Sequence, residues 1–345
     1  MRAPPIILLL VLLAGLPVGG TPSVWPAGGL PAGERYPYGS PAFEVLVADS
    51  YAQAGSAGVQ PFTPWFAQAF ARYERRALTD ALDAAPHDLA AQGDPTRRVR
   101  LELQAAVWIY GVIKTTIPRF SLDRGYEFAN VVRFGERQCL LQSVLLASLL
   151  QAMGLDAGVY MVWQNPHGEV SNNGHAVTVL KLSDGRDVLV DASEREPFSE
   201  HQGVFLVDRT TGRYRFVHPR FNADATIGGY QPESGGGSLA PAAVRPLDVT
   251  FLRSQFYYYR GERVPDGVLG RSATPDGLAA SARYLEHAQT LDPANPLAVY
   301  MLGTVYRRQG RFAAARIQYA RGYRLYQIYG FVPDGPKTAF AQSAY

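Results

Sequence analysis

The chain has 345 residues, of which 47% are hydrophobic and 18% are charged. This length is sufficient for two domains, and the composition excludes a disordered protein and describes an ordinary globular one. The formal net charge is only +3, and no basic run with interleaved aromatic residues occurs, so we expect no nucleic-acid partner.

The N-terminus is typical of an export signal. Arg2 supplies positive charge, residues 6–16 form a short apolar run, and small residues at 18–20 follow as a cleavage site. We therefore expect a signal peptide at 1–20 and a secreted or periplasmic protein that keeps no stable membrane anchor after cleavage. An uncleaved anchor and a misassigned start are the alternatives. Residues 21–60 begin with a Pro- and Gly-rich stretch, and we expect them to be loose.

Helical patterns come next along the chain. Residues 61–82 carry aromatic and Ala side chains at helical spacing. Asp94 followed by Pro95 predicts a second helix start, because a capping side chain then precedes a Pro in the first turn. This helix should stop before Pro118. Cys139 opens a third helix that is apolar around most of its circumference, so we expect it to be buried and central.

Strand patterns follow the Cys139 helix. The runs that predict strands are 158–163, 175–182, 188–191, 203–208 and 214–218. The turn at 183–186 joins the second and third of them. A buried helix followed by strands of this kind predicts an α+β fold with an antiparallel sheet.

The last third of the chain changes character. The stretch 228–241 contains Gly-Gly, Pro and Ser-Gly-Gly-Gly-Ser, so we expect a linker at 226–245. Helical patterns return in 246–345, where the spacing resembles a tetratricopeptide repeat. The residues that carry this resemblance are Val299, Leu302, Gly303, Tyr306, Ala315 and Tyr319. So short a repeat cannot bury a free-standing solenoid, so we expect it to pack on the main domain.

The C-terminal helices are also basic. Residues 301–345 hold six Arg and one Lys against one Asp, which gives a net charge of +6. A solvated Arg-rich helix face is one interpretation. The other is a surface for an anionic partner, such as an acidic protein, a membrane or a wall polymer, so the helices are a candidate protein-binding surface.

Cys139 is the single cysteine of the chain, so it cannot form an internal disulfide. In an exported protein it is either a buried small hydrophobe or a nucleophile. Its place at a helix start favours the nucleophile, because a helix N-terminus and a neighbouring imidazole both stabilise a thiolate.

His175 and Asp191 are the candidates for an imidazole and for the carboxylate that orients it. His175 begins one predicted strand, and Asp191 ends the next, where its burial requires a partner. A tight Asp-Gly turn would place Asp191 opposite Thr178 instead, so the contact requires a bulge, a wider loop or strand twist.

Four motifs together resemble the core of the papain-like, transglutaminase-like cysteine enzymes. They are Gly-Glu-Arg-Gln-Cys at 135–139, Met-Gly-Leu-Asp-Ala at 153–157, Gly-His-Ala-Val at 174–177 and Val-Asp-Ala-Ser at 190–193. The resemblance covers roughly 108–208 and implies a catalytic domain at 61–225. In that family the central helix carries the Cys and packs on an antiparallel sheet. The resemblance therefore implies that Cys139 is the nucleophile, His175 the general base and acid, and Asp191 the orienting residue.

The family resemblance implies acyl transfer on the amide bonds of a peptide or protein substrate, by hydrolysis, crosslinking or deamidation. An inactive scaffold that binds a protein through its helical repeat is the alternative. We expect no cofactor and no metal, because phosphate-binding loops and metal-ligand spacings do not occur in the sequence. The histidines outside the proposed triad, which lack such spacing, are His87, His167, His201, His218 and His287.

The Cys139 backbone N–H is a natural oxyanion donor at a helix start. Candidates for a second donor are Gln104, Trp108 and Gln138, each of which also has a structural interpretation.

Overall fold

The structure is a computed structural model that describes residues 35–55 and 58–343. The predicted signal peptide at 1–20 lies outside the described residues. Within them, no helix combines the length and the apolar character that crossing a membrane requires.

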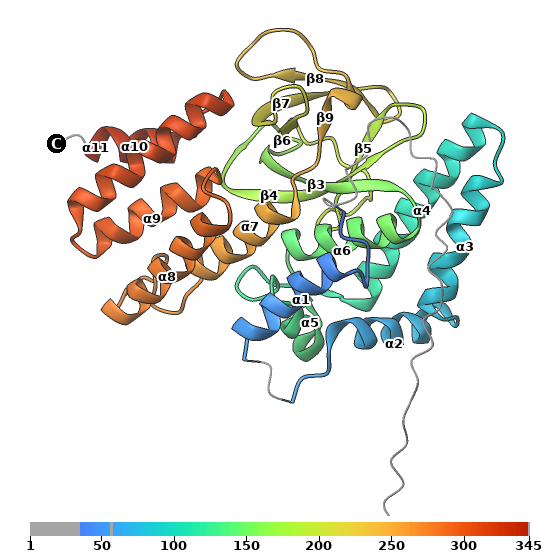
Figure 1. Cartoon of the computed structure of the whole chain (residues 1–345), viewed down its shortest axis with the longest axis horizontal. Helices are drawn as coiled ribbons and strands as arrows, with labels where there is room; N and C mark the ends of the chain where they lie inside the picture. The colour runs from blue at the N-terminus through green and yellow to red at the C-terminus, as the bar shows by residue number, and fades with distance from the viewer. Residues whose placement is uncertain (1–34, 56–57, 344–345) are drawn as a thin grey trace, which may run out of the picture.

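The fold is α+β, as predicted, with helices at both ends of the chain and a sheet in its middle (Figure 1). The N-terminal helices are α1 (Pro41–Gln53), α2 (Phe62–Glu74), α3 (Leu78–Ala90), α4 (Pro95–Thr116), α5 (Phe128–Phe134) and α6 (Cys139–Ala152). The C-terminal helices are α7 (Val249–Glu262), α8 (Pro275–Leu291), α9 (Pro296–Arg308), α10 (Phe312–Tyr329) and α11 (Asp334–Ser343).

The sheet closes into a six-stranded antiparallel barrel. Its strands are β3 (Asp156–Gln164), β4 (Val170–Lys181), β5 (Asp187–Val190), β6 (Gly203–Asp208), β7 (Arg213–Phe221) and β8 (Ile227–Pro232). They are hydrogen-bonded in the order β3-β4-β5-β8-β7-β6, and β6 pairs back with β3. The short β9 (Val244–Arg245) adds to β6, and β1 (Arg119–Phe120) and β2 (Glu136–Arg137) form a separate parallel pair.

Successive side chains of each strand point to opposite faces of the sheet, so the strands contribute to two apolar cores. One fills the barrel and includes Tyr160, Val177, Val179 and Leu189. The neighbouring residues on the same strands point outward and join the larger core under the helices. Strands with both faces buried read as continuous apolar runs, which is why β3 and β5 were predictable from sequence.

Helix α6 is the central helix that the sequence predicts. It packs on β3 and β4, and nearly all of its residues are buried. Two hydrogen bonds fasten its middle to β4: Ser143 Oγ donates to the Ala176 carbonyl, and Thr178 Oγ1 donates to the Ser143 carbonyl, both at 3.0 Å. The first turn of α6 is thereby fixed relative to the strand that carries His175.

Two predictions for the N-terminal part were wrong. Residues 41–53 of the segment expected to be loose form α1, because Ser40 caps its start and Phe43 and Leu46 are buried. The single helix expected at 61–82 is two helices, since Arg75 adopts a left-handed conformation that ends α2. The helix predicted at Asp94 is confirmed: the Asp94 carboxylate caps α4 by accepting from Thr96 N.

The linker predicted at 226–245 was also wrong, because β8 and β9 lie within it. Tyr230 on β8 is fully buried, and its hydroxyl donates to Asp187 Oδ2 at 2.6 Å. Asp187 also accepts from Lys181 at 3.0 Å, so this segment completes the barrel and satisfies a buried acid. The longest exposed stretch of this segment is the turn at 233–238.

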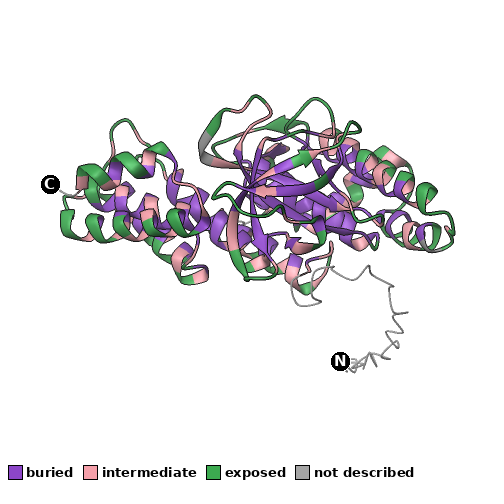
Figure 2. Cartoon of the chain, turned by 90° about the horizontal axis from the view of Figure 1, so that it is seen from above, coloured by how far each residue is buried: buried purple, intermediate pink, exposed green. Residues whose placement is uncertain are grey.

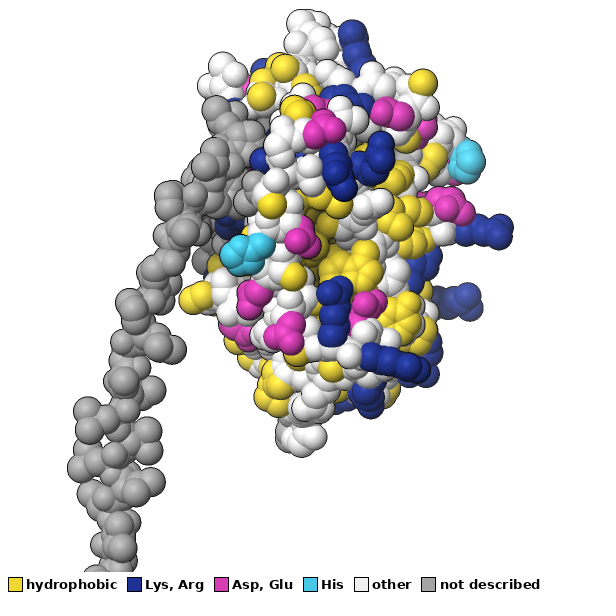
Figure 3. All heavy atoms as spheres, turned by 90° about the vertical axis from the view of Figure 1, so that its right-hand side faces the viewer, with side chains coloured by type: hydrophobic (Ala, Val, Ile, Leu, Met, Phe, Trp, Pro, Cys, Tyr) yellow, Lys and Arg dark blue, Asp and Glu magenta, His cyan; other side chains and the backbone are white. Residues whose placement is uncertain are grey.

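The C-terminal helices α8–α11 extend from one end of an elongated molecule (Figure 2). They pack on the barrel through aromatic contacts, with ring centroids of Phe331 and Trp163 4.4 Å apart and those of Tyr329 and Phe205 5.6 Å apart. The predicted packing of this segment on the main domain is therefore confirmed. At the other end of the molecule, acidic and basic side chains are intermixed on the surface (Figure 3).

Helix α7 connects the barrel to these helices and is buried along most of its length. Arg260 on α7 forms a buried bidentate ion pair with Glu127, the residue before α5, at 2.7 and 2.9 Å. Paired burial of this kind fixes α7 against the N-terminal helices, because separating the two charges would leave each unpaired in a dry environment.

Candidate active site

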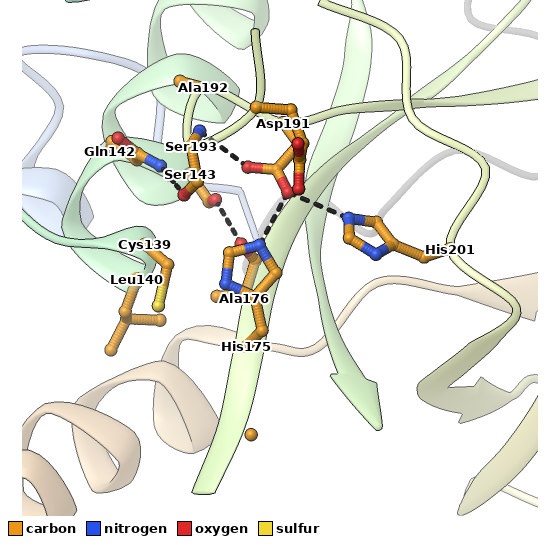
Figure 4. Close-up of polar contacts among 12 residues, drawn as sticks. Cys139, Leu140, Gln142, Ser143, His175, Ala176, Asp191, Ala192, Ser193 and His201 are labelled. Carbon is orange, nitrogen blue, oxygen red and sulfur yellow. Dashed lines mark hydrogen bonds and ion pairs between the residues drawn. The ribbon is translucent and has the colours of Figure 1, made fainter. Parts of the chain in front are cut away.

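The candidate site lies at one rim of the barrel, where β5 ends and β6 begins. Cys139, His175 and Asp191 meet there, as the sequence predicts (Figure 4). Cys139 is the first residue of α6, and Gln138 caps this helix by accepting from Leu140 N at 2.9 Å. The thiol therefore lies beside the positive end of a helix dipole.

The loop between β4 and β5 decides whether His175 can reach Asp191. Leu182 N donates to the Arg186 carbonyl at 2.7 Å, and Gly185 between them is left-handed. Three residues, not two, thus lie inside the turn, a common hairpin form with a glycine bulge. The wider loop that the sequence required is present.

This loop shifts the strand register by one residue. Thr178 pairs with Val190, so Asp191 comes opposite Val177 rather than Thr178. His175 is two residues from Val177 on the same face, and diagonal neighbours of this kind are within reach of long side chains. The His175 Nε2 to Asp191 Oδ2 distance is 2.6 Å.

The other ring nitrogen of His175 is turned toward the Cys139 sulfur (Figure 4). Burial alone would lower the pKa of His175, but the negative charge of Asp191, together with Cys139 and hydrogen bonds to both, raises it well above 6.5. These contacts favour the cationic imidazole, which is the form that pairs with a thiolate and can donate a proton.

Three donors hold the Asp191 carboxylate, which is fully buried. Oδ2 accepts from His175 at 2.6 Å and from His201 Nε2 at 2.9 Å, and Oδ1 accepts from Ser193 N at 2.8 Å. Burial alone would raise the pKa of Asp191, but the charge of His175 and the hydrogen bonds from both imidazoles lower it far below 3.8. The carboxylate is thus ionised and fixed in place.

His201 is a site residue that sequence reasoning missed. It lies in the segment before β6 and is 2% exposed, and it contacts the same Asp191 oxygen as His175, with the two ring centroids 5.4 Å apart (Figure 4). His201 lies in no metal-ligand spacing or motif. Its separation of ten residues from Asp191 corresponds to no helix or strand pattern that would place the two side chains together. Only the path of the chain from β5 to β6 brings it to the carboxylate.

The same three groups could be considered as metal ligands, since one atom each of His175, Asp191 and His201 lie within 4.8 Å of one another. The two contacts to Asp191, at 2.6 and 2.9 Å, are hydrogen-bond lengths. Donor atoms that share a zinc ion with bonds of about 2.0–2.1 Å are usually spread farther apart. A ligating imidazole also donates through its other nitrogen, whereas Nδ1 of His201 has no partner among the described residues.

A buried network supports the loop that carries Asp191. Arg137 donates to Gln142 Oε1 at 2.8 Å and to the Ala192 carbonyl at 3.5 Å, and Gln142 donates to Ser193 Oγ. Arg137 and Gln142 flank the first turn of α6, so the network joins the helix that carries Cys139 to the residues just after Asp191.

The predicted second oxyanion donors have other roles or positions. Trp108 Nε1 donates to Glu74 at 2.9 Å, and Gln104 is exposed on α4. The side-chain oxygen of Gln138 caps α6. The NH₂ group of the same side chain is left for a hydrogen bond with the Tyr259 hydroxyl. Neither Trp108 nor Gln104 is therefore placed to act on a substrate at Cys139.

Tyr259 is the second site residue that the sequence did not reveal. It comes from α7, and its hydroxyl is 3.9 Å from the Cys139 sulfur and 3.3 Å from the Gly174 carbonyl, to which it donates. Tyr126 stacks on its ring, with centroids 6.0 Å apart. The aromatic run at 256–259 was visible in the sequence, but nothing in it indicated which ring reaches the thiol.

Access to the site is through His175. Cys139 is only 4% exposed, whereas the side chain of His175 is 25% exposed. A carbonyl compound would therefore reach the sulfur from the side of the imidazole.

In comparison with known proteins, the chain matches no family model, and no curated protein or solved structure is significantly similar to it.

Proposed function

We propose that this protein is an exported cysteine enzyme that transfers acyl groups from peptide or protein amides through Cys139. The observation that carries the proposal is the chain of contacts from Asp191 through His175 to the only thiol, at the start of a buried helix. The Asp191 carboxylate is fully buried, where it can orient the imidazole, and the imidazole itself is partly exposed, where it can exchange a proton with a substrate.

The papain-like, transglutaminase-like assignment of residues 61–225 is part of this proposal. It rests on the four motifs and on the packing of α6 against antiparallel β3 and β4. Export rests on the apolar N-terminus alone, and the tetratricopeptide-like assignment rests on the residue pattern in α9 and α10.

In the proposed reaction the Cys139 thiolate adds to the amide carbonyl carbon, and the carbonyl π electrons move to oxygen. Collapse of this intermediate expels the amine, which takes a proton from the His175 nitrogen that faces the sulfur. Water then adds to the thioester with His175 as base, and the thiolate leaves. Asp191 keeps the ring oriented and stabilises its charge. We favour hydrolysis over transfer to an amine, because water is always available.

A peptide library incubated with a labelled primary amine tests the reaction and its class. Mass spectrometry separates cleaved backbones, deamidated Gln side chains and amine adducts. We expect one of these product classes with the wild type and none with Cys139→Ala or His175→Ala. Products that persist in Cys139→Ala, or that appear with none of the proteins, contradict the proposal.

A second candidate function is protein binding through the C-terminal helices, with an inactive transglutaminase-like scaffold. The supporting observation is a groove of about 420 Å³ between α9, α10 and α11. Arg307 and Arg316 line it beside Phe312, which is 66% exposed. Neither arginine forms an ion pair with a carboxylate of the described chain, so an acidic segment with one apolar side chain fits this surface.

A labelled acidic peptide of Asp and Glu with one central Leu tests the second candidate. It should bind wild type and Cys139→Ala equally, and the matched Asn and Gln peptide should not bind. Arg316→Glu should abolish binding, whereas Arg324→Glu, which makes the same charge change on α10 outside the groove, should weaken it only slightly. Equal effects of the two substitutions would show that net charge alone attracts the peptide.

A further inference from the structure

We infer that the Tyr259 hydroxyl is the second oxyanion donor of this site, acting with the Cys139 backbone N–H on the carbonyl oxygen of an acyl substrate. The inference rests on the proposed function, since it concerns the intermediate formed on Cys139. It also assigns a catalytic residue to α7, outside the segment that the sequence marks as catalytic.

The position of the hydroxyl relative to the sulfur is the first support. In the tetrahedral intermediate the oxyanion is two bonds from sulfur, and effective donors lie about 2.7–3.1 Å from it. A hydroxyl oxygen 3.9 Å from the sulfur is close enough to meet this requirement. Its contact with the Gly174 carbonyl is long, at 3.3 Å, so exchanging it for an anionic acceptor costs little.

The surroundings of Tyr259 are the second support. The residue is 2% exposed, so water does not compete for the hydroxyl. Tyr126 stacks on the ring and Gln138 bonds to the hydroxyl, which fixes its direction before a substrate arrives. Burial raises the pKa of Tyr259 well above 10, so the group keeps the proton that a donor needs.

The other donor belongs to the helix that carries the nucleophile. Cys139 is the first residue of α6, and the N–H groups of a first turn have no intrahelical acceptor. During attack the sulfur–carbon bond forms as the π pair moves onto oxygen. Both donors then hold that oxygen by hydrogen bonds and transfer no proton. When the intermediate collapses, the pair returns to carbon and the amine leaves with a proton from His175.

Two reagents separate this role from a general effect on the thiol. Iodoacetamide alkylates sulfur by displacement at a saturated carbon and forms no oxyanion, whereas a peptide thioester acylates it through a tetrahedral oxyanion. We expect Tyr259→Phe to lower the second-order rate constant of Cys139 acylation by about 10²–10³-fold. Its alkylation rate constant should stay within about twofold of the wild type.

Tyr257→Phe is the matched control, because it removes a hydroxyl from another buried tyrosine of α7, whose ring packs on His287, and should change neither rate constant. Thermal unfolding of both variants checks that they fold. Equal slowing of both reactions in Tyr259→Phe, faster reaction with both reagents, or unchanged acylation would each overturn the inference. If the Cys139 thiol of the wild type reacts with neither reagent, the result contradicts the proposed function itself. The inference about Tyr259 is then contradicted as well.

Discussion

His201→Phe is the substitution that most clearly isolates how Asp191 is held. The ring volume is nearly kept, but the 2.9 Å hydrogen bond from Nε2 to Asp191 Oδ2 is lost. Hydrogen bonds to charged groups contribute about 1.5–3 kcal/mol, and at a fully buried carboxylate no water replaces the donor. Nδ1 of His201 has no partner among the described residues, and its burial destabilises the fold. Because His201→Phe removes this nitrogen, about 1 kcal/mol of the lost stability is offset.

We therefore expect His201→Phe to lower the free energy of unfolding by about 0.5–2 kcal/mol at pH 7, measured by urea titration. The pH dependence gives a second reading. Because the folded-state pKa of Asp191 lies far below 3.8, its contribution is present above 3.8 and is lost as pH falls through the folded value. Fewer donors raise that folded pKa, so the difference in unfolding free energy between variant and wild type should narrow only as pH falls through the variant's folded pKa, below 3.8.

His218→Phe is the control for the loss of a His–carboxylate contact. His218 Nε2 is 2.5 Å from Glu233, but the two side chains are 36% and 33% exposed. Exposed pairs of this kind contribute about 0–1 kcal/mol. If His201→Phe unfolds at the same urea concentration as the wild type, or costs no more than His218→Phe, then His201 does not hold the carboxylate as we argue.

Two further predictions concern the residues around the imidazole. Asp191→Asn should move the alkaline limb of the acylation pH profile to lower pH, because the anion that helps raise the pKa of His175 is gone; an unmoved limb would contradict this. Gly174→Ala should cost about 1–2 kcal/mol in unfolding free energy, because φ is +67°, whereas the 2.8 Å approach of the added Cβ to Met161 Cε can be relieved by movement of that flexible side-chain end. Gly185→Ala, with φ of +86° and open space around the added Cβ, should cost about the same, and a clearly larger loss at Gly174 would refute this.

Local signals in the sequence predicted the parts of the site that lie on regular elements. The helix beginning at Cys139 follows from its apolar circumference and the start signals before it. The meeting of His175 and Asp191 was predictable as a pairing of adjacent strands, but its register was not. One extra residue in the loop around Gly185 set that register, and turn length is a property that the dipeptide Asp-Gly does not fix.

Features that depend on distant partners were not predictable. Residues 226–245 look like a linker by composition, yet Tyr230 within them donates to Asp187 on another strand of the barrel. His201 and Tyr259 reach the site from segments that no motif connects to it. Their roles arise from where the closed barrel and α7 place them, and a sequence pattern describes only near neighbours along the chain.

The central claim is that the imidazole of His175 activates the only thiol of the molecule. The direct measurement is the rate of Cys139 alkylation by dilute iodoacetamide at neutral pH, in the wild type, His175→Ala and the control His218→Ala. We expect His175→Ala to react at least about tenfold more slowly than the other two, because the cation that stabilises the thiolate is missing. Equal labelling of all three proteins would contradict the account.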